Sequence, residues 1–298
     1  MIEQATNDFP LFERLQIESQ AHCNRDCWFC SRTYDRSGTY LDHRGKPVKR
    51  QMPTETILDL LDQAGALGFR GRVGFHHYSE PLLDKRNIEL AAAALHRGMK
   101  PYLHTNGDLL KRSVELCHEV CEVYGLIVVG IYDYDTNDQL EAEKQFWYDR
   151  LPDANLQFSC IGNQGAGKAY SIGIPKALVP TDPRMATPDL SYANAPCHRP
   201  LIRMIIRHDG GVSNCCEDTF GAFNLGNIHE ASLRRLWFSE RHRKVAGDLI
   251  AGRREDYRLC RSCPLPPSAR RPDGQPIRMD RRQYDGADAE REPASELS

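Results

Sequence analysis

The sequence predicts an α/β protein built around a parallel sheet, and two observations support this prediction. Short apolar runs such as residues 126–131 alternate along the chain with segments of helical periodicity such as residues 54–64. The alternation yields at least five expected strands before residue 165. Alternating helices and strongly apolar strands are typical of parallel βαβ units, in a barrel or in a doubly wound sheet. A chain of 298 residues is long enough to bury a large core.

The expected elements of the first half follow from local patterns. The first strand, 11–20, contains an alternating apolar–polar run, and a charged, glycine-containing loop is expected at 35–52. The first helix, 54–64, begins after Pro53 and ends near Gly68. Further strands are expected at 72–76, 101–104, 126–131 and 156–161, and further helices at 87–96, 109–123 and 139–150.

The second half changes character. Residues 165–195 lose periodicity and read as a connection with one more strand at 171–174. A hairpin is expected from 202–207 and 211–215, turning on 208–210, and a helix from 232–251. We therefore expect a main domain at 10–190, a small cysteine-bearing module at 196–266 and a disordered tail at 267–298, which has almost no large apolar residues.

Composition limits the partners of the protein. The net charge of −2, from 39 basic and 41 acidic residues, gives no electrostatic reason to expect nucleic acid. No run approaches the roughly 20 apolar residues that a membrane helix needs, and the N-terminus does not read as a signal peptide. We expect a cytoplasmic protein without a membrane partner. Its 11 cysteines then favour metal ligation over disulfides.

Three cysteines near the N-terminus carry the strongest chemical signal. Cys23, Cys27 and Cys30 have the spacing C-x₃-C-x₂-C. Three thiolates can hold three corners of a 4Fe–4S cube and leave the fourth iron without a protein ligand. An iron that is open in this way can bind a substrate, so the spacing indicates a reactive cluster.

A strand followed by this cysteine loop, with the aromatic Phe29 directly before Cys30, resembles the opening of the radical S-adenosylmethionine (SAM) enzymes. In that family SAM chelates the open iron, and one electron cleaves it to methionine and a 5′-deoxyadenosyl radical that abstracts a hydrogen atom from substrate. The resemblance implies a partial (β/α)₆ TIM-like barrel for the main domain. It also implies an electron donor such as flavodoxin or ferredoxin.

A second set of four cysteines lies in the C-terminal module: Cys197, Cys215, Cys260 and Cys263. Four cysteines can close a metal site, and their spacing alone leaves zinc and an iron–sulfur cluster open. The segments 214–218, 225–228 and 260–263 resemble the SPASM/twitch extension of radical SAM enzymes. Because no cysteine follows Cys263, the resemblance is to the shorter twitch form, a β-hairpin plus helix with one auxiliary 4Fe–4S cluster. The expected cofactors are SAM and two 4Fe–4S clusters.

The same resemblance assigns further site residues. Glu80 stands in Tyr-Ser-Glu-Pro, where the family usually has Gly-Gly-Glu-Pro. Its carboxylate would accept a hydrogen bond from the SAM amino group. The other expected contacts are Phe29 near the adenine, Thr105 and Asn106 at the SAM cleft, and Asp133 on the ribose hydroxyls. Cys216 is a candidate hydrogen donor, because some radical SAM epimerases return a hydrogen atom from a free thiol.

The function expected from the resemblance is that of a radical SAM oxidoreductase of specialised metabolism. Similarity to twitch enzymes of the 2-deoxy-scyllo-inosamine dehydrogenase type predicts oxidation or epimerisation of a carbinol carbon in a sugar or aminocyclitol. One alternative is modification of a ribosomally made peptide, although only 22 residues precede Cys23, too few for a leader-binding domain. The alternative from another class is a zinc-binding structural or adaptor protein.

Overall fold

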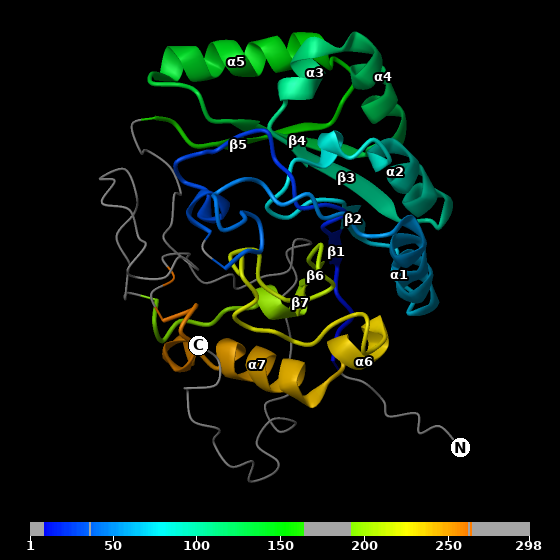
Figure 1. Cartoon of the computed structure of the whole chain (residues 1–298), viewed down its shortest axis with the longest axis vertical. Helices are drawn as coiled ribbons and strands as arrows, with labels where there is room; N and C mark the ends of the chain where they lie inside the picture. The colour runs from blue at the N-terminus through cyan, green and yellow to red at the C-terminus, as the bar shows by residue number, and fades with distance from the viewer. Residues whose placement is uncertain (1–8, 36, 164–191, 262, 264–298) are drawn as a thin grey trace.

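The computed structural model describes residues 9–35, 37–163, 192–261 and 263, and they form a seven-stranded sheet in the order β5-β4-β3-β2-β1-β6-β7 (Figure 1). All neighbouring strands are parallel except β6 and β7. Because β5 and β7 do not pair with each other, the barrel is partial and not closed. The strands are β1 (Arg14–Ile17), β2 (Arg72–Gly74), β3 (Lys100–Thr105), β4 (Leu126–Ile131), β5 (Leu156–Cys160), β6 (Arg203–Ile206) and β7 (Val212–Ser213).

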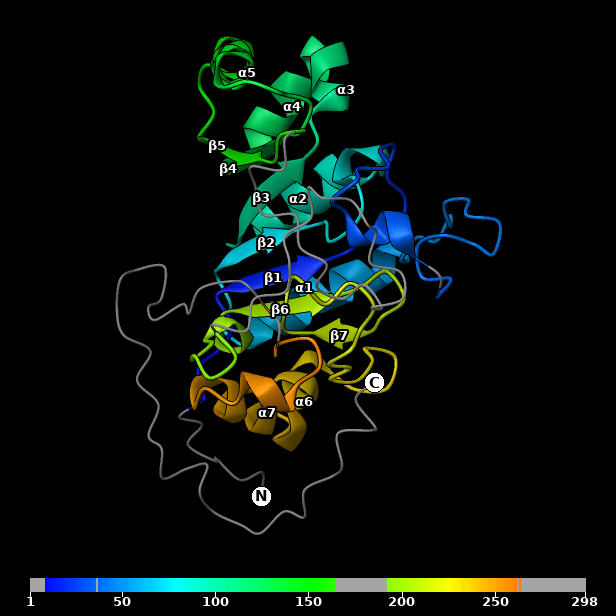
Figure 2. The ribbon, with the colours of Figure 1, turned by 90° about the vertical axis from the view of Figure 1, so that its left-hand side faces the viewer.

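One face of the sheet packs against helices. Leu15, Val73, Leu103 and Ile127 all belong to a single buried apolar cluster with helical residues. Figures 1 and 2 show the helices α1, α2 and α4 stacked along this face. The helices are α1 (Thr54–Ala66), α2 (Asn87–His96), α3 (Asp108–Arg112), α4 (Val114–Val123), α5 (Asn137–Arg150), α6 (Leu233–Trp237) and α7 (Glu240–Ile250). Short 3₁₀ helices lie at Ser31–Tyr34 (η1), Pro81–Leu83 (η2), Arg199–Leu201 (η4) and Arg254–Asp256 (η5).

Two expected helices are each broken into two by an internal serine. The segment 109–123 contains α3 and α4, because Ser113 is extended (φ −134°) and its hydroxyl accepts from the backbone N–H of Leu116. The segment 232–251 contains α6 and α7, because Ser239 caps the second helix through the N–H of His242. The sequence-based prediction of single helices was therefore wrong, since a serine that caps a new helix also fits inside a helical pattern.

The C-terminal hairpin is the element that joins the two halves of the chain. β6 and β7 form the expected hairpin, and Gly210 supplies the positive φ of its turn. β6 also pairs in parallel with β1, with Met204 opposite Leu15, so the hairpin extends the main sheet. The boundaries predicted for the two domains stay a prediction. The expected strand at 171–174 and the tail at 267–298 lie outside the described residues.

Within the described ranges, no helix combines the length and the apolar character that crossing a membrane requires.

Candidate functional site

The first cysteine loop follows β1 and is held by its own backbone. The N–H of Cys30 donates to the carbonyl of Cys27 at 3.0 Å, and the Thr33 hydroxyl donates to the same carbonyl at 3.0 Å. The thiols lie within electrostatic reach of one another. Burial, followed by the neighbouring thiols of Cys30 and Cys23, raises the pKa of Cys27 to about 12.

This donor set fits an iron–sulfur cluster. Burial also raises the pKa of Cys23 and raises that of Cys30 to about 11, so three thiolates at this place need a compensating positive charge. The iron ions of a cluster core supply that charge, and each thiolate binds a different iron. In the part of the chain that the structure describes, no three Cys, His, Asp or Glu side chains are arranged to ligate one single metal ion.

Three of the predicted site residues meet beside this loop. The Glu80 carboxylate accepts from the Thr105 hydroxyl at 2.7 Å and from the Asn106 backbone N–H at 2.8 Å. Burial raises the pKa of Glu80 to about 7. The Asn106 amide contacts the Cys23 sulfur at 4.0 Å. Glu80, Thr105 and Asn106 thus form one network at the carboxyl ends of β2 and β3, where ligands bind in parallel sheets; their contacts with SAM stay a prediction.

Phe29 belongs to the cysteine loop, and Asp133 faces the loop from the end of β4. The Phe29 ring packs edge-on against Tyr132, with ring centroids 4.9 Å apart. Asp133 is three-quarters exposed and forms an ion pair of 2.7 Å with Arg25. The loop therefore contacts the end of β4 twice, through Phe29 on Tyr132 and through Arg25 on Asp133. Their expected roles, adenine packing for Phe29 and ribose binding for Asp133, stay predictions.

Arg25 is a site residue that the sequence did not reveal. It lies between two of the cysteines, and its Nε donates to Asp108 at 2.8 Å while its Nη1 donates to Asp133. Asp108 also accepts from the Asn24 amide at 2.7 Å. Arg25 therefore fixes the cysteine loop to the segments that follow β3 and β4. Its spacing from the two aspartates, 83 and 108 residues, carries no local signal.

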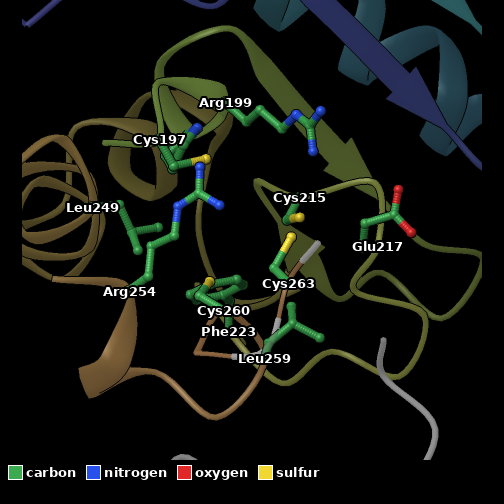
Figure 3. Close-up of a pocket in the computed structure, with 11 residues that line it drawn as sticks. Cys197, Arg199, Cys215, Glu217, Phe223, Leu249, Arg254, Leu259, Cys260 and Cys263 are labelled. Atoms are coloured by element: carbon green, nitrogen blue, oxygen red, sulfur yellow. The ribbon is translucent and has the colours of Figure 1, made fainter. Parts of the chain in front are cut away.

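The second cysteine set surrounds one pocket (Figure 3). Cys197, Cys215, Cys260 and Cys263 come from three separate segments and all line it, together with the apolar Phe223, Leu249 and Leu259. The pocket encloses about 400 Å³ of space, part of it open to solvent. Burial, then the Cys197 and Cys263 thiols, raises the pKa of Cys260 well above its usual range. Four close thiols around an apolar pocket fit a fully ligated 4Fe–4S cluster.

Charged residues complete the surroundings of this pocket. Arg199, Arg254 and Glu217 line it with the cysteines (Figure 3). Cys216, the candidate hydrogen donor, contacts the Glu217 carboxylate through its sulfur at 3.5 Å. The hydrogen-donor role of Cys216 stays a prediction.

One short segment touches the surroundings of both cysteine sets. His77 and Tyr78 follow β2 and directly precede the Glu80 network. The Tyr78 hydroxyl donates to the carbonyl of Cys216 at 3.0 Å, and the His77 Nε2 lies 3.4 Å from the carbonyl of Asp218. The segment 77–80 therefore connects the loop of the first cysteine set to the loop of the second.

Comparisons with known proteins agree with this geometry. Residues 17–136 match the family model of the radical SAM superfamily, and residues 197–264 match SPASM, an iron–sulfur cluster-binding domain. A curated relative is the S-adenosyl-L-methionine-dependent 2-deoxy-scyllo-inosamine dehydrogenase of Niallia circulans. It is 26% identical over 264 residues, which cover 85% of this chain and 93% of the relative.

Solved structures share the fold. The crystal structure of BtrN in complex with AdoMet and 2-DOIA has a TM-score of 0.64 at 22% identity and covers 86% of this chain and 94% of BtrN. A structure of anSMEcpe with bound AdoMet has a TM-score of 0.51 at 12% identity and covers 85% of both chains. The predicted α/β fold with a partial barrel is confirmed, and so are the two predicted iron–sulfur modules.

Proposed function

For this chain, a radical SAM enzyme with a C-terminal SPASM iron–sulfur domain, we propose that the reaction is the oxidation of a secondary alcohol. The substrate class we propose is a polyhydroxylated ring, a sugar or a cyclitol, of specialised metabolism. The similarity to a 2-deoxy-scyllo-inosamine dehydrogenase, which extends over most of both chains, supports a dehydrogenation.

The observation that carries this proposal is the segment 77–80. The Glu80 N–H donates to the carbonyl of His22, directly before Cys23, at 2.9 Å, and the Tyr78 hydroxyl donates to the carbonyl of Cys216 in the second cysteine loop. A substrate bound beside this segment is therefore close to both cluster sites. Oxidation of a carbinol to a ketone removes one hydrogen atom, one proton and one electron. It therefore needs a hydrogen-atom acceptor on one side, an electron acceptor on the other, and a base that takes the hydroxyl proton.

Each of the two cofactor sites would serve a different part of this reaction. When bound, the cluster held by Cys23, Cys27 and Cys30 supplies the electron that turns SAM into a hydrogen-abstracting species, and the auxiliary cluster supplies an acceptor for the substrate electron. The residues of the chain fix the geometry. Glu80, held by Thr105 and Asn106, would orient the SAM amino group, and Arg25 would keep the cysteine loop against β3 and β4.

We also infer the cellular setting from the cysteines. Eleven cysteines, seven of them assigned to clusters, suit the cytoplasm, where thiols stay reduced. The reaction needs an electron donor, for which a flavodoxin or a ferredoxin is the natural class. The proposal leaves out nucleic acid as a partner, because the chain is close to electroneutral.

The test of the proposed function is metal content combined with SAM cleavage after anaerobic reconstitution. We expect about eight iron and eight sulfide per chain, with 5′-deoxyadenosine formed on reduction. Cys27→Ala should lose about four iron and abolish 5′-deoxyadenosine. The double change of Cys260 and Cys263 to Ala should lose the other four but keep some cleavage. Cys121→Ala, at an exposed cysteine of α4, is the matched control.

Stoichiometric zinc with little iron would overturn the enzyme assignment in favour of a structural zinc protein. About four iron in the wild type would mean that one cysteine set holds no cluster.

A further inference from the structure

The face of the sheet opposite the helices carries a row of basic residues. Side chains alternate between faces along a strand. Leu15 and Val73 point to the helices, so Arg14 and Arg72 belong to the other face. The register places Arg14 directly opposite both Arg72 and Arg203, and Arg72 opposite Lys100. Each of the four is the first residue of its strand, so four cations lie in line at the amino ends of β3, β2, β1 and β6. Arg72 and Lys100 are exposed there, whereas Arg14 and Arg203 are half-buried and interact electrostatically with Tyr102, one layer nearer the carboxyl ends.

This row places like charges side by side, and the cost falls on Arg14. Neighbouring strands are only about 4.8 Å apart, and like charges directly opposite each other destabilise a sheet. Burial, then Arg203, lowers the pKa of Arg14. Glu13 offsets part of this repulsion at Arg14. At Arg203, burial acts against the charged form, but Cys216 and Tyr102 outweigh it and raise the pKa of the guanidinium. An anion bound here would relieve this repulsion.

Neutral hydrogen-bonding groups lie directly beyond the row on the same face. The ring of His76 is 5.1 Å from that of Tyr102 and 5.4 Å from that of His104, between centroids. His76 is only 5% exposed, and its Nδ1 has no hydrogen-bond partner in the described structure. Burial lowers the pKa of His104 to about 4, so both imidazoles are neutral at pH 7.

The backbone of β2 is adapted to this cluster. A Cβ at Gly74 would come within 2.7 Å of the His76 ring and 2.8 Å of the Tyr102 ring. Any residue larger than glycine would therefore displace one or both rings. Buried polar side chains normally have partners, and one that lacks a partner is free to bind an ordered water or a ligand. The glycine and the unpartnered imidazole together point to a built polar site.

The position of this site fits a substrate between the two cluster loops. His76 directly precedes the segment 77–80, which reaches the first cysteine loop. Arg203 interacts electrostatically with Cys216, next to the auxiliary ligand Cys215. A molecule held by Arg203 and His76 would therefore lie within the partial barrel, next to the segment 77–80.

We propose that Arg14, Arg203, His76, Tyr102 and His104 form the substrate subsite, and that the substrate is a polyol that carries an oxyanion, a phosphate ester or a carboxylate. This inference rests on the proposed function and names its substrate class. The two arginines bind the oxyanion, and the imidazoles and the Tyr102 hydroxyl bind the ring hydroxyls. A cationic aminocyclitol is disfavoured here, because its ammonium group would meet Arg203.

The test is calorimetric binding to the reconstituted enzyme with SAM at saturation, so that the added anions do not compete for the SAM site. The probes are inorganic phosphate, glucose 6-phosphate, glucuronate and glucosamine. We expect at least one anionic sugar to bind more tightly than glucosamine. Arg203→Gln and Arg14→Gln should each weaken its binding by about ten-fold or more, and Arg203→Lys by less. Tighter glucose 6-phosphate indicates a phosphate ester, and tighter glucuronate a carboxylate.

Arg97→Gln is the control, because Arg97 forms an exposed ion pair with Asp62 on the helical side. The proposal is overturned if no anionic probe binds up to about 50 mM, which would exclude even weak sites of millimolar class. Equal affinities of the wild type and Arg203→Gln, or preferred binding of glucosamine, would overturn it too. A chain that binds anions through Arg203 but fails to cleave SAM would refute the proposed function and leave the anion subsite standing.

Discussion

The hydroxyl of Tyr78 donates a hydrogen bond of 3.0 Å to the backbone carbonyl of Cys216. Tyr78 lies two residues before Glu80, and Cys216 directly follows the auxiliary ligand Cys215. Through this bond, the three residues from Tyr78 to Glu80 join the second cysteine loop to the Glu80 carboxylate, which lies beside the first cysteine loop. Tyr78 is a positioning residue in this arrangement, since it fixes the distance between the two cofactor sites.

Removing this hydroxyl should loosen the connection without removing a ligand. Tyr78→Phe should destabilise the fold by about 1 kcal/mol, because the Cys216 carbonyl loses a partner. We expect unchanged iron content but less oxidised product per 5′-deoxyadenosine, measured by mass spectrometry of both. Tyr148→Phe, on the exposed side of α5, is the control. An unchanged ratio of product to 5′-deoxyadenosine would show that Tyr78 has no positioning role.

Glu18 makes the stability of this region depend on pH. Its fully buried carboxylate accepts from the Tyr78 N–H at 2.8 Å and from the Tyr40 hydroxyl at 3.1 Å. Burial raises the pKa of Glu18 from 4.5 to about 7. Between these values the folded chain binds more protons than the unfolded chain, so this contribution to stability is present at low pH and is lost as the pH rises through 7.

Glu18→Gln should remove that dependence. Between pH 4.5 and 8, the wild type should lose on the order of 3 kcal/mol of unfolding free energy relative to the variant, measured by urea denaturation at each pH. Comparison with the variant cancels the titration of the buried histidines. Glu55→Gln, an exposed first-turn residue of α1, should follow the wild type at every pH. Parallel curves for the wild type and Glu18→Gln would contradict the assignment.

Local patterns in the sequence were enough to predict much of the fold. The all-apolar run 126–131 is β4, and the amphipathic run after Pro53 is α1. The pairing of β6 with β1 was not predictable, because it joins Arg14 to Arg203 across nearly two hundred residues with no local signal. The break at Ser113 was missed because a serine is tolerated within helices and also caps them.

In the site too, features that depend on local sequence were predictable, and features that depend on long-range contacts were not. Cysteine spacing is a local property, and the four cysteines of the second set do line one pocket. Glu80, Thr105 and Asn106 were expected at one cleft because they follow neighbouring strands, but the hydrogen bonds that join them were not predicted. The ion pairs of Arg25 and the row from Lys100 to Arg203 depend on strand register, which only the folded sheet reveals.

Replacing Cys216 distinguishes oxidation from epimerisation. Oxidation to a ketone returns no hydrogen atom to the substrate, so Cys216→Ala should still give the oxidised product, although the nearby cluster site could lower the yield. For the wild type in D₂O, we expect no solvent deuterium at the reacting carbon, measured by mass spectrometry. Deuterium there, together with a shunt product from Cys216→Ala, would instead assign epimerisation with Cys216 as the hydrogen donor.

Arg199 should tune the potential of the auxiliary cluster. It lines the same pocket as the four cysteines (Figure 3), and a cluster held by four thiolates gains negative charge on reduction. A nearby half-buried cation stabilises the reduced form, so Arg199→Gln should lower the midpoint potential by about 60 mV, equivalent to about 1.4 kcal/mol. Redox titration followed by electron paramagnetic resonance measures this directly, without any substrate.

The matched control for this prediction is Arg258→Gln, which removes the same charge from an exposed residue beside Cys260. Solvent screens that charge, so its loss should leave the potential nearly unchanged. Equal shifts in the two variants would mean that net charge, and not the position of Arg199 in the pocket, sets the potential. A shift confined to Arg199→Gln, with iron content intact, would instead identify Arg199 as the residue that makes the auxiliary cluster a better electron acceptor.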